Sequence, residues 1–357
     1  MGACGLGAGL RAALQEDCMK ISRITMAATL ASGLAFAAGA QAQQITGAGA
    51  TFPAPVYAKW GEAAKAAIGI ELNYQAIGSG GGQNQILNRT VDFGASDAPM
   101  TAEKLDAGKL LQIPTVMGAL VPVINLPGIE DGQLKLTGEL LADIYFGKIT
   151  KWNDPKLVEL NRDLKLPSTA IAPVYRADGS GTTYVWVSYL AAVSPEWKEK
   201  VGVATSVKWP AGTGAKGNDG VAATVKNTRG AIGYVESAYA IQNKLTGTQI
   251  RNKAGHFVKP NPETFIAAAS NANWAGAQNF VVDLIDQMGD KSWPVVSATF
   301  VLLPKDPKDP VRSANVTKFL DWAYSNGSPI AAQLEYTPLP KAVQDAARSA
   351  WATQIKH

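Results

Sequence analysis

Hydrophobic and polar positions follow two different periods in neighbouring stretches of the chain. In segment 70–77 polarity alternates along the chain, which predicts a strand. In segment 53–67 apolar side chains return every three or four positions, which predicts an amphipathic helix with Thr51 as its cap and Pro53 in its first turn. The face of this helix that we expect to be buried carries Val56, Tyr57, Trp60, Ala63, Ala64 and Ala67.

The alternation of strand and helix patterns continues along the chain. Segments 91–96 and 171–175 predict short strands, and segment 183–192 predicts an apolar helix. Repeated strand, loop and helix units are typical of α/β architecture, in which ligands bind at the carboxyl ends of strands. No long linker interrupts residues 43–357, and their length is sufficient for two domains. We therefore expect two domains that are joined by crossing strands, with a hinge between them.

Three short loops are rich in glycine and hydroxyl side chains and contain no lysine. They span residues 47–52, 78–82 and 178–182, and each follows a predicted strand and precedes a predicted helix. A helix N-terminus presents unpaired N–H groups and a partial positive charge, so it binds anions readily. A single loop of this kind is more often an ordinary turn. Three together predict a cage of neutral donors around a small oxyanion, which is typical of a binding protein rather than of an enzyme.

The motifs of several enzyme classes are missing from the sequence. No Gly-Lys-Ser or Gly-Lys-Thr occurs, no loop has the G-x-G-x-x-G spacing, and neither Ser79 nor Ser180 has a glycine two residues before it. The only histidines are His256 and His357, so a histidine-based triad or metal cluster is disfavoured, and His256 is expected at the surface or in a loop. We expect no catalytic residue, no metal and no cofactor.

Two oppositely charged residues, Arg176 and Asp178, lie beside the third loop. An exposed ion pair would contribute little to stability. At a strand end next to an anion cage, however, the guanidinium suits bidentate contact with an oxyanion, and the neighbouring carboxylate would hold it in orientation.

Asp97 follows the predicted strand at 91–96, and a carboxylate near an anion site requires an explanation. Phosphate keeps at least one proton at neutral pH, whereas sulfate keeps none. An ionised Asp97 can accept a hydrogen bond from a phosphate O–H but faces sulfate with unmatched acceptors. A site built around such a bond can reject the analogue that lacks it by about 10⁴-fold. Asp97 is therefore the expected selectivity residue.

The N-terminal region has the three parts of a secretory signal at residues 19–42. A basic part is followed by an apolar run at 26–40, and cleavage is expected after Ala42. A membrane anchor is the alternative, but the apolar run is shorter than the roughly 18 residues that a spanning helix needs. We interpret residues 1–18 as an extension ahead of the true start at the next methionine.

The cysteine content supports export to the periplasm, and the net charge bears on the choice of partner. Both cysteines, Cys4 and Cys18, precede the signal, so the mature chain has no disulfide, no thiolate nucleophile and no cysteine to carry a lipid anchor. The formal net charge of the whole chain is +4, which gives no reason to expect nucleic acid or a membrane surface as a partner.

At these residues the sequence resembles the periplasmic phosphate-binding proteins of bacterial high-affinity phosphate ABC importers. The resemblance covers essentially all of the mature chain. It is carried by segments 46–55, 78–82, 91–99, 176–182, 216–220, 230–236 and 319–324. It implies a two-domain, hinged α/β periplasmic binding protein of type II, in which each domain is a central sheet flanked by helices. The implied first domain comprises residues 43–116 and 288–357, and the second comprises residues 117–287.

The resemblance also implies a function and a set of contacts. Inorganic phosphate would bind, dehydrated, in the cleft between the domains and pass to an inner-membrane phosphate ABC permease with its ATPase. The binding protein would be a monomer. The phosphate ligands of the family match Thr51, Phe52, Ser79, Asp97, Arg176, Ser180, Gly181 and Thr182, with Asp178 as the carboxylate that pairs with Arg176.

Two other functions stay open from the residues alone. The first is a binding protein for another oxyanion, such as sulfate, molybdate or phosphonate. Asp97 argues against the fully ionised anions but does not separate arsenate from phosphate. The second is a secreted hydrolase of the phosphatase type that uses the cage for a transition state, although the sequence offers no evident pair of nucleophile and base and no metal ligands.

Overall fold

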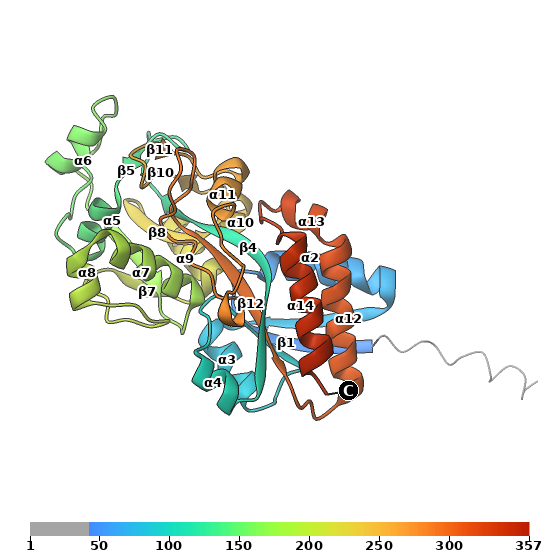
Figure 1. Cartoon of the computed structure of the whole chain (residues 1–357). Coiled ribbons are helices and arrows are strands. Elements are labelled where there is room, and N and C mark those ends of the chain that lie inside the picture. Colours follow the sequence, from blue (N-terminus) through green and yellow to red (C-terminus); the bar gives the residue numbers. More distant parts are fainter. Residues whose placement is uncertain (1–42, 357) are drawn as a thin grey trace, which may run out of the picture. The chain divides into compact units, whose positions relative to one another are not determined.

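The computed structural model describes residues 43–356, and the predicted signal at 19–42 and the extension at 1–18 lie outside them. In the described part, strands and helices alternate in an α/β arrangement (Figure 1). The strands are β1 Gln43–Gly49, β2 Ile70–Ala76, β3 Phe93–Ser96, β4 Leu110–Ile124, β5 Lys135–Leu136, β6 Ala172–Arg176, β7 Thr213–Ala215, β8 Ala231–Glu236, β9 Thr246–Gly247, β10 Gln249–Arg251, β11 Phe257–Val258 and β12 Val296–Pro304.

The helices of the described part connect these strands and cover the sheet. They are α2 Ala54–Ile68, α3 Ser79–Leu87, α4 Ala102–Ala107, α5 Gly138–Tyr145, α6 Pro155–Leu160, α7 Gly181–Val193, α8 Pro195–Lys200, α9 Gly217–Asn227, α10 Ser237–Gln242, α11 Pro262–Ala269, the 3₁₀ helix η1 Gln278–Phe280, α12 Pro310–Asn326, α13 Ser328–Gln333 and α14 Lys341–Gln354. Although far apart in the sequence, α12 packs against α2 as well as against α14 (Figure 1). Between residues 43 and 356, none of the helices combines the length and the apolar character that crossing a membrane requires.

A mixed sheet of nine strands has β4 near its middle. Its order is β2-β1-β3-β12-β4-β8-β6-β7, and β9 also pairs with β4. Residues 110–119 of β4 pair with β12 and residues 120–124 pair with β8, both antiparallel. All 15 residues of β4 are buried. The strand β4 therefore joins the part of the sheet that contains β12, β3, β1 and β2 to the part that contains β8, β6 and β7.

The domain limits implied by the resemblance stay a prediction. One limit, between residues 116 and 117, falls inside β4, just before that strand exchanges β12 for β8 as its partner. The other, between residues 287 and 288, falls in the segment before β12.

The strand and the helix predicted nearest the N-terminus are confirmed, but the predicted helix cap is wrong. Segment 70–77 forms β2 and segment 53–67 forms α2. The N-cap position of α2 is Pro53, and no side chain caps this helix. The hydroxyl of Thr51 instead accepts a hydrogen bond from Asn218 at 2.8 Å, because the turn that precedes α2 directs it towards α9.

The buried face of α2 is close to the predicted one. The structure buries Val56, Tyr57, Trp60, Gly61 and Ala64. Ala63 is half-buried, and Ala67 is exposed because it lies in the last turn, beside the exposed Gly69 that ends the helix.

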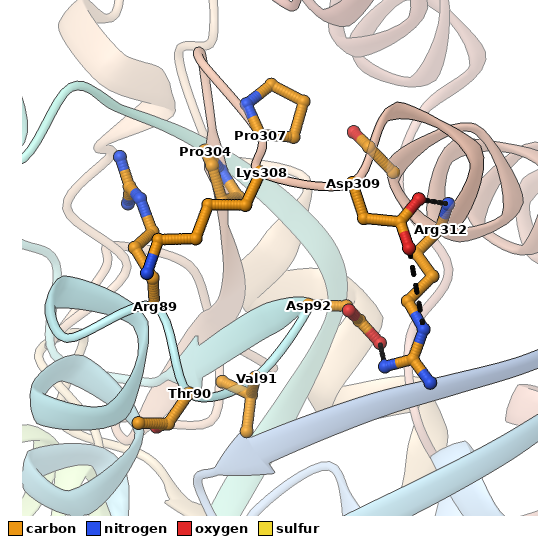
Figure 2. Close-up of a pocket in the computed structure, with 10 residues that line it drawn as sticks. Arg89, Thr90, Val91, Asp92, Pro304, Pro307, Lys308, Asp309 and Arg312 are labelled. Atoms are coloured by element: carbon orange, nitrogen blue, oxygen red, sulfur yellow. Dashed lines mark hydrogen bonds and ion pairs between the residues drawn. The ribbon is translucent and has the colours of Figure 1, made fainter.

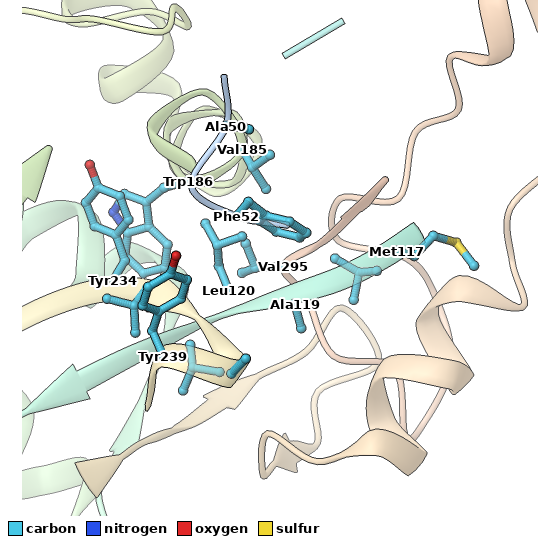
Figure 3. Close-up of a cluster of buried hydrophobic side chains, with 14 of the residues drawn as sticks. Ala50, Phe52, Met117, Ala119, Leu120, Val185, Trp186, Tyr234, Tyr239 and Val295 are labelled. Atoms are coloured by element: carbon cyan, nitrogen blue, oxygen red, sulfur yellow. The ribbon is translucent and has the colours of Figure 1, made fainter. Parts of the chain in front are cut away.

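The side chain of Phe52 anchors the first glycine-rich loop in the hydrophobic core. Phe52 is fully buried, and Figure 3 shows its ring close to Leu120 and Val295. Burial of such a ring stabilises the fold by about 1.5–3 kcal/mol. Because the ring is committed to the core, only the backbone of Phe52 is available to a ligand.

Candidate functional site

The three glycine-rich loops meet at the carboxyl ends of β1, β2 and β6. They lead into α2, α3 and α7, as the sequence predicts. The second and third loops are joined directly, because the N–H of Gly80 donates to the carbonyl of Gly179 at 2.8 Å. Gly78 has a φ of 90°, and a Cβ there would lie 2.8 Å from the same carbonyl. This close approach therefore requires glycine at position 78.

Asn218, at the start of α9, joins the first loop to the third. It is fully buried. Its Nδ2 donates to the hydroxyl oxygens of Thr51 at 2.8 Å and of Thr182 at 3.1 Å. Because both oxygens accept, both hydroxyl protons remain available to a ligand. The Oδ1 of Asn218 accepts from the N–H of Glu236 at 3.2 Å, which fixes the orientation of the amide. Sequence reasoning missed Asn218, although segment 216–220 is among those that carry the resemblance.

The guanidinium of Arg176 is buried at the carboxyl end of β6. Its Nε and Nη2 donate to the two carboxylate oxygens of Asp178 at 2.8 and 2.5 Å, and its Nη1 donates to Thr182 at 3.2 Å. These bonds use three of the five N–H groups of a guanidinium, and one N–H on each Nη is left for a ligand. Two donors on one charged guanidinium suit an oxyanion.

Asp178 is ionised and holds the guanidinium in place. Burial acts to raise the pKa of Asp178, but the hydrogen bonds and the charge of Arg176, together with backbone N–H groups, outweigh burial and lower the pKa. One of these groups is the N–H of Gly217, which donates to Oδ1 at 3.1 Å. The ion pair therefore compensates the buried charge of Arg176, which would be costly without a partner.

Asp97 directly follows β3 and is almost fully buried. Its Oδ1 accepts from the hydroxyl of Thr299 at 2.8 Å, whereas Oδ2 has no hydrogen-bond partner within residues 43–356. Burial raises the pKa of Asp97 to about 7, although the Thr299 hydrogen bond, the charge of Arg176 and the hydroxyl of Ser79 oppose this rise. A buried polar atom without a partner is rare in folded proteins, so the state of Oδ2 indicates that a ligand supplies the missing hydrogen-bond donor.

Sequence reasoning also missed Thr299, the donor to Oδ1 of Asp97. The two residues are 202 positions apart. They meet because β12 pairs with β3, with Phe300 opposite Ser96. The apolar pattern of β12 gives no sign of this pairing.

The N-terminus of α7 lies against Asp97 and Ser79. Ser180 is the N-cap of this helix and accepts from the N–H of Thr183 at 2.9 Å. A Cβ at Gly181 would lie 2.5 Å from Oδ2 of Asp97. Ser79, the first residue of α3, accepts from the N–H of Asp97 at 3.1 Å. A helix N-terminus, hydroxyl donors and an unpartnered carboxylate oxygen thus converge, which suits an oxyanion that carries a proton.

Two other pockets in the described part contain few or none of the predicted site residues. A pocket of about 260 Å³ at the amino end of β3 contains none of the predicted site residues, and in it Arg312 lies 3.6 Å from Asp92 and 3.9 Å from Asp309 (Figure 2). A cavity of about 510 Å³, bordered by α7, β12 and residues 281–286, reaches Asp97. His256 lies exposed in a loop, as expected, and no group of three His, Cys, Asp or Glu residues in the described part could hold a metal ion.

Comparison with known proteins decides the family. A model described as a PBP superfamily domain matches residues 35–327. The phosphate-binding protein PstS of Pasteurella multocida is 53% identical over 321 residues, which are 90% of this chain and 93% of that protein. The phosphate-binding protein PstS of Haemophilus influenzae is 51% identical over 317 residues, 89% of this chain and 95% of that protein. This chain belongs to the PstS family.

A solved structure supports the fold class. A high-affinity periplasmic phosphate-binding protein bound with phosphate (PfluDING) superimposes with a TM-score of 0.71 at 20% identity, over 87% of this chain and 94% of that one. This likeness confirms the expected α/β fold of a periplasmic binding protein.

Proposed function

We propose that this protein captures inorganic phosphate where the three loops meet and delivers it to an inner-membrane ABC permease with its ATPase. In this proposal it acts in the periplasm, after removal of the signal at 19–42, as a monomer without a cofactor. The relatives from P. multocida and H. influenzae, both more than half identical to this chain, are named phosphate-binding proteins.

The observation that carries the proposal is the unpartnered Oδ2 of Asp97 among hydrogen-bond donors. A fully ionised oxyanion would place a second set of lone pairs against this oxygen. Phosphate instead offers it an O–H at neutral pH. The hydroxyls of Thr51 and Ser79 and the guanidinium of Arg176 would then hold the other phosphate oxygens.

Neutral donors can bind a dehydrated anion here because they are already oriented in a buried site. The bridge from Asn218 to Thr51 crosses between the two predicted domains. Closing over phosphate would therefore form this bridge, and opening would break it. The permease would distinguish the closed form from the open one, and phosphate would shift the population towards closure.

Isothermal titration of the mature protein, stripped of ligand, tests the proposal. We expect tight one-to-one binding of phosphate and no heat with sulfate at about pH 8, where Asp97 is ionised. Absence of phosphate binding, or equal binding of both anions, would contradict it.

Rejection of sulfate should weaken in acid. Because burial raises the pKa of Asp97 to about 7, its carboxyl is ionised above that pH and neutral below it. A neutral carboxyl carries a proton that it can donate to a sulfate oxygen. We therefore expect measurable sulfate binding at about pH 5.5 and none at about pH 8.5. Sulfate titrations that are identical at both values would show that Asp97 does not sense the proton of the anion.

Gly181→Ala should lower the affinity for phosphate by at least about 100-fold, a loss of roughly 2.7 kcal/mol. The new Cβ would lie 2.5 Å from Oδ2 of Asp97, so the carboxylate or the helix must move. Gly220→Ala in α9 is the matched control, because its Cβ would meet nothing closer than 3.7 Å. Calorimetry and thermal unfolding of both variants separate lost binding from lost stability, and an unchanged affinity in Gly181→Ala would place phosphate elsewhere.

A further inference from the structure

A second buried carboxyl, that of Glu236, is connected to the first glycine-rich loop through the side chain of Tyr336. Glu236 ends β8 and is fully buried. Its Oε2 accepts from the N–H of Ala238 at 3.0 Å and lies 2.8 Å from the hydroxyl oxygen of Tyr336. The same hydroxyl oxygen lies 2.6 Å from the carbonyl oxygen of Phe52.

A count of protons shows the state of this carboxyl. A tyrosine hydroxyl has one proton, and the carbonyl of Phe52 has none. If Tyr336 donated to Glu236, two sets of lone pairs would face each other 2.6 Å apart at Phe52. Both contacts are satisfied when Tyr336 donates to Phe52 and Glu236 donates to Tyr336. This arrangement requires a protonated Glu236.

The surroundings of Glu236 favour the neutral form. Burial raises the pKa of Glu236 well above its ordinary value and outweighs the opposing effects of the Tyr336 contact and of the Ala238 N–H, and the charges of Glu335 and Asp97 raise it further. Glu335 itself accepts from the hydroxyl of Ser237 at 2.9 Å. The titratable groups that act on Glu236 are Tyr336, Glu335 and Asp97. The cation Arg176 acts on the neighbouring Tyr239 and Asp97.

The chain of hydrogen bonds from Glu236 ends at the carbonyl of Phe52, the residue whose N–H we expect to touch phosphate. The hydroxyl of Tyr336 holds the carbonyl of Phe52, and the hydroxyl of Tyr239 holds the carbonyl of Thr51 at 2.7 Å. In a trans peptide the N–H points away from the carbonyl, so fixing the carbonyl of Thr51 aims the N–H of Phe52. The N–H of Glu236 also orients Asn218, which donates to Thr51.

We propose that Glu236 is a positioning residue for phosphate that acts as a neutral carboxylic acid and takes up its proton from solvent when the protein closes over the anion. The proposal rests on the proposed function. Phe52 and Tyr336 belong to the predicted first domain, and Glu236 belongs to the second. Opening would separate them and admit water, so that Glu236 returns towards the ordinary glutamate pKa of about 4.3 and ionises at neutral pH.

Proton uptake during binding tests this inference. Phosphate is titrated at about pH 7 into the unmutated protein and into Glu236→Gln, in buffers with different enthalpies of ionisation. Protonation changes of phosphate and of Asp97 contribute equally to the proton uptake of both proteins. The difference in proton uptake between the two proteins therefore reports Glu236 alone. We expect Glu236→Gln to take up about one proton fewer. Glu71→Gln is the matched control, because Glu71 on β2 is only partly exposed and, among the described residues, forms an ion pair with Lys65 alone, at 3.0 Å.

The outcomes separate the inference from the function on which it rests. If the unmutated protein binds phosphate and Glu236→Gln takes up the same number of protons, the inference is wrong and the function stands. If the unmutated protein does not bind phosphate, the proposed function itself is wrong, and the inference is overturned with it.

A measurement on the unmutated protein covers the case in which Glu236→Gln fails to fold. Infrared difference spectra between the phosphate-bound and phosphate-free protein, with glutamate carboxyl carbons labelled with ¹³C, should show a new band of a protonated carboxyl that carries the isotope shift. Tyr336→Phe, which removes the acceptor of that proton, should change the frequency of the band. Absence of a labelled band on phosphate binding would overturn the inference.

Discussion

Replacing Asp97 with asparagine should remove most of the discrimination between phosphate and sulfate. In the unmutated protein the buried Oδ2 accepts but does not donate when Asp97 is ionised, and a site of this kind can reject the wrong anion by about 10⁴-fold. The amide of Asp97→Asn would place an N–H donor near the same position. We expect the two affinities to come within about tenfold of each other, chiefly through a gain for sulfate.

Competition titration of sulfate against bound phosphate measures this effect. Asp92→Asn is the matched control. Asp92 precedes the amino end of β3, whereas Asp97 follows its carboxyl end, and Oδ2 of Asp92 accepts from the N–H of Thr46 at 2.7 Å. That variant should keep the discrimination. If Asp97→Asn still rejected sulfate by about 10⁴-fold, the carboxylate would have no part in selectivity.

Replacing Arg176 with alanine should cost more phosphate affinity than replacing Asp178. Each charge-assisted hydrogen bond contributes about 1.5–3 kcal/mol, so the loss of two such bonds should weaken binding by about 10²–10⁴-fold. Asp178→Ala removes only the group that orients the guanidinium and compensates its charge, and we expect a loss of about tenfold.

Calorimetry of both variants, with Arg176→Lys as a third, distinguishes direct contact from scaffolding. Lysine keeps the charge but lacks the planar pair of donors, so its affinity should lie between those of the unmutated protein and Arg176→Ala. Equal losses in Arg176→Ala and Asp178→Ala would show that the ion pair is only structural.

The parts of the site that the sequence predicted are those with local signals. Glycine-rich loops, an N-cap serine such as Ser180 and the adjacent Arg176 and Asp178 lie within a few residues of one another, so their spacing alone indicates a strand that leads into an anion-binding helix start. The structure brings these residues together with Thr51, Ser79 and Asp97, all of them buried or nearly so.

The residues that the sequence could not reveal depend on pairing between distant segments. Thr299 reaches Asp97 only because β12 lies beside β3, and Tyr336 reaches Phe52 across 284 positions. The incorrect prediction of Thr51 as a helix cap has the same origin. Its hydroxyl could have capped α2 locally, but Asn218, 167 positions away, donates to it instead.

The crystal structure of the protein with bound phosphate tests the central claim most directly. We predict one phosphate between the three loops, with one of its oxygens within hydrogen-bond distance of Oδ2 of Asp97 and two others facing the Nη1 and Nη2 atoms of Arg176. A phosphate bound elsewhere, or an Oδ2 that turns to a donor of the protein, would contradict it.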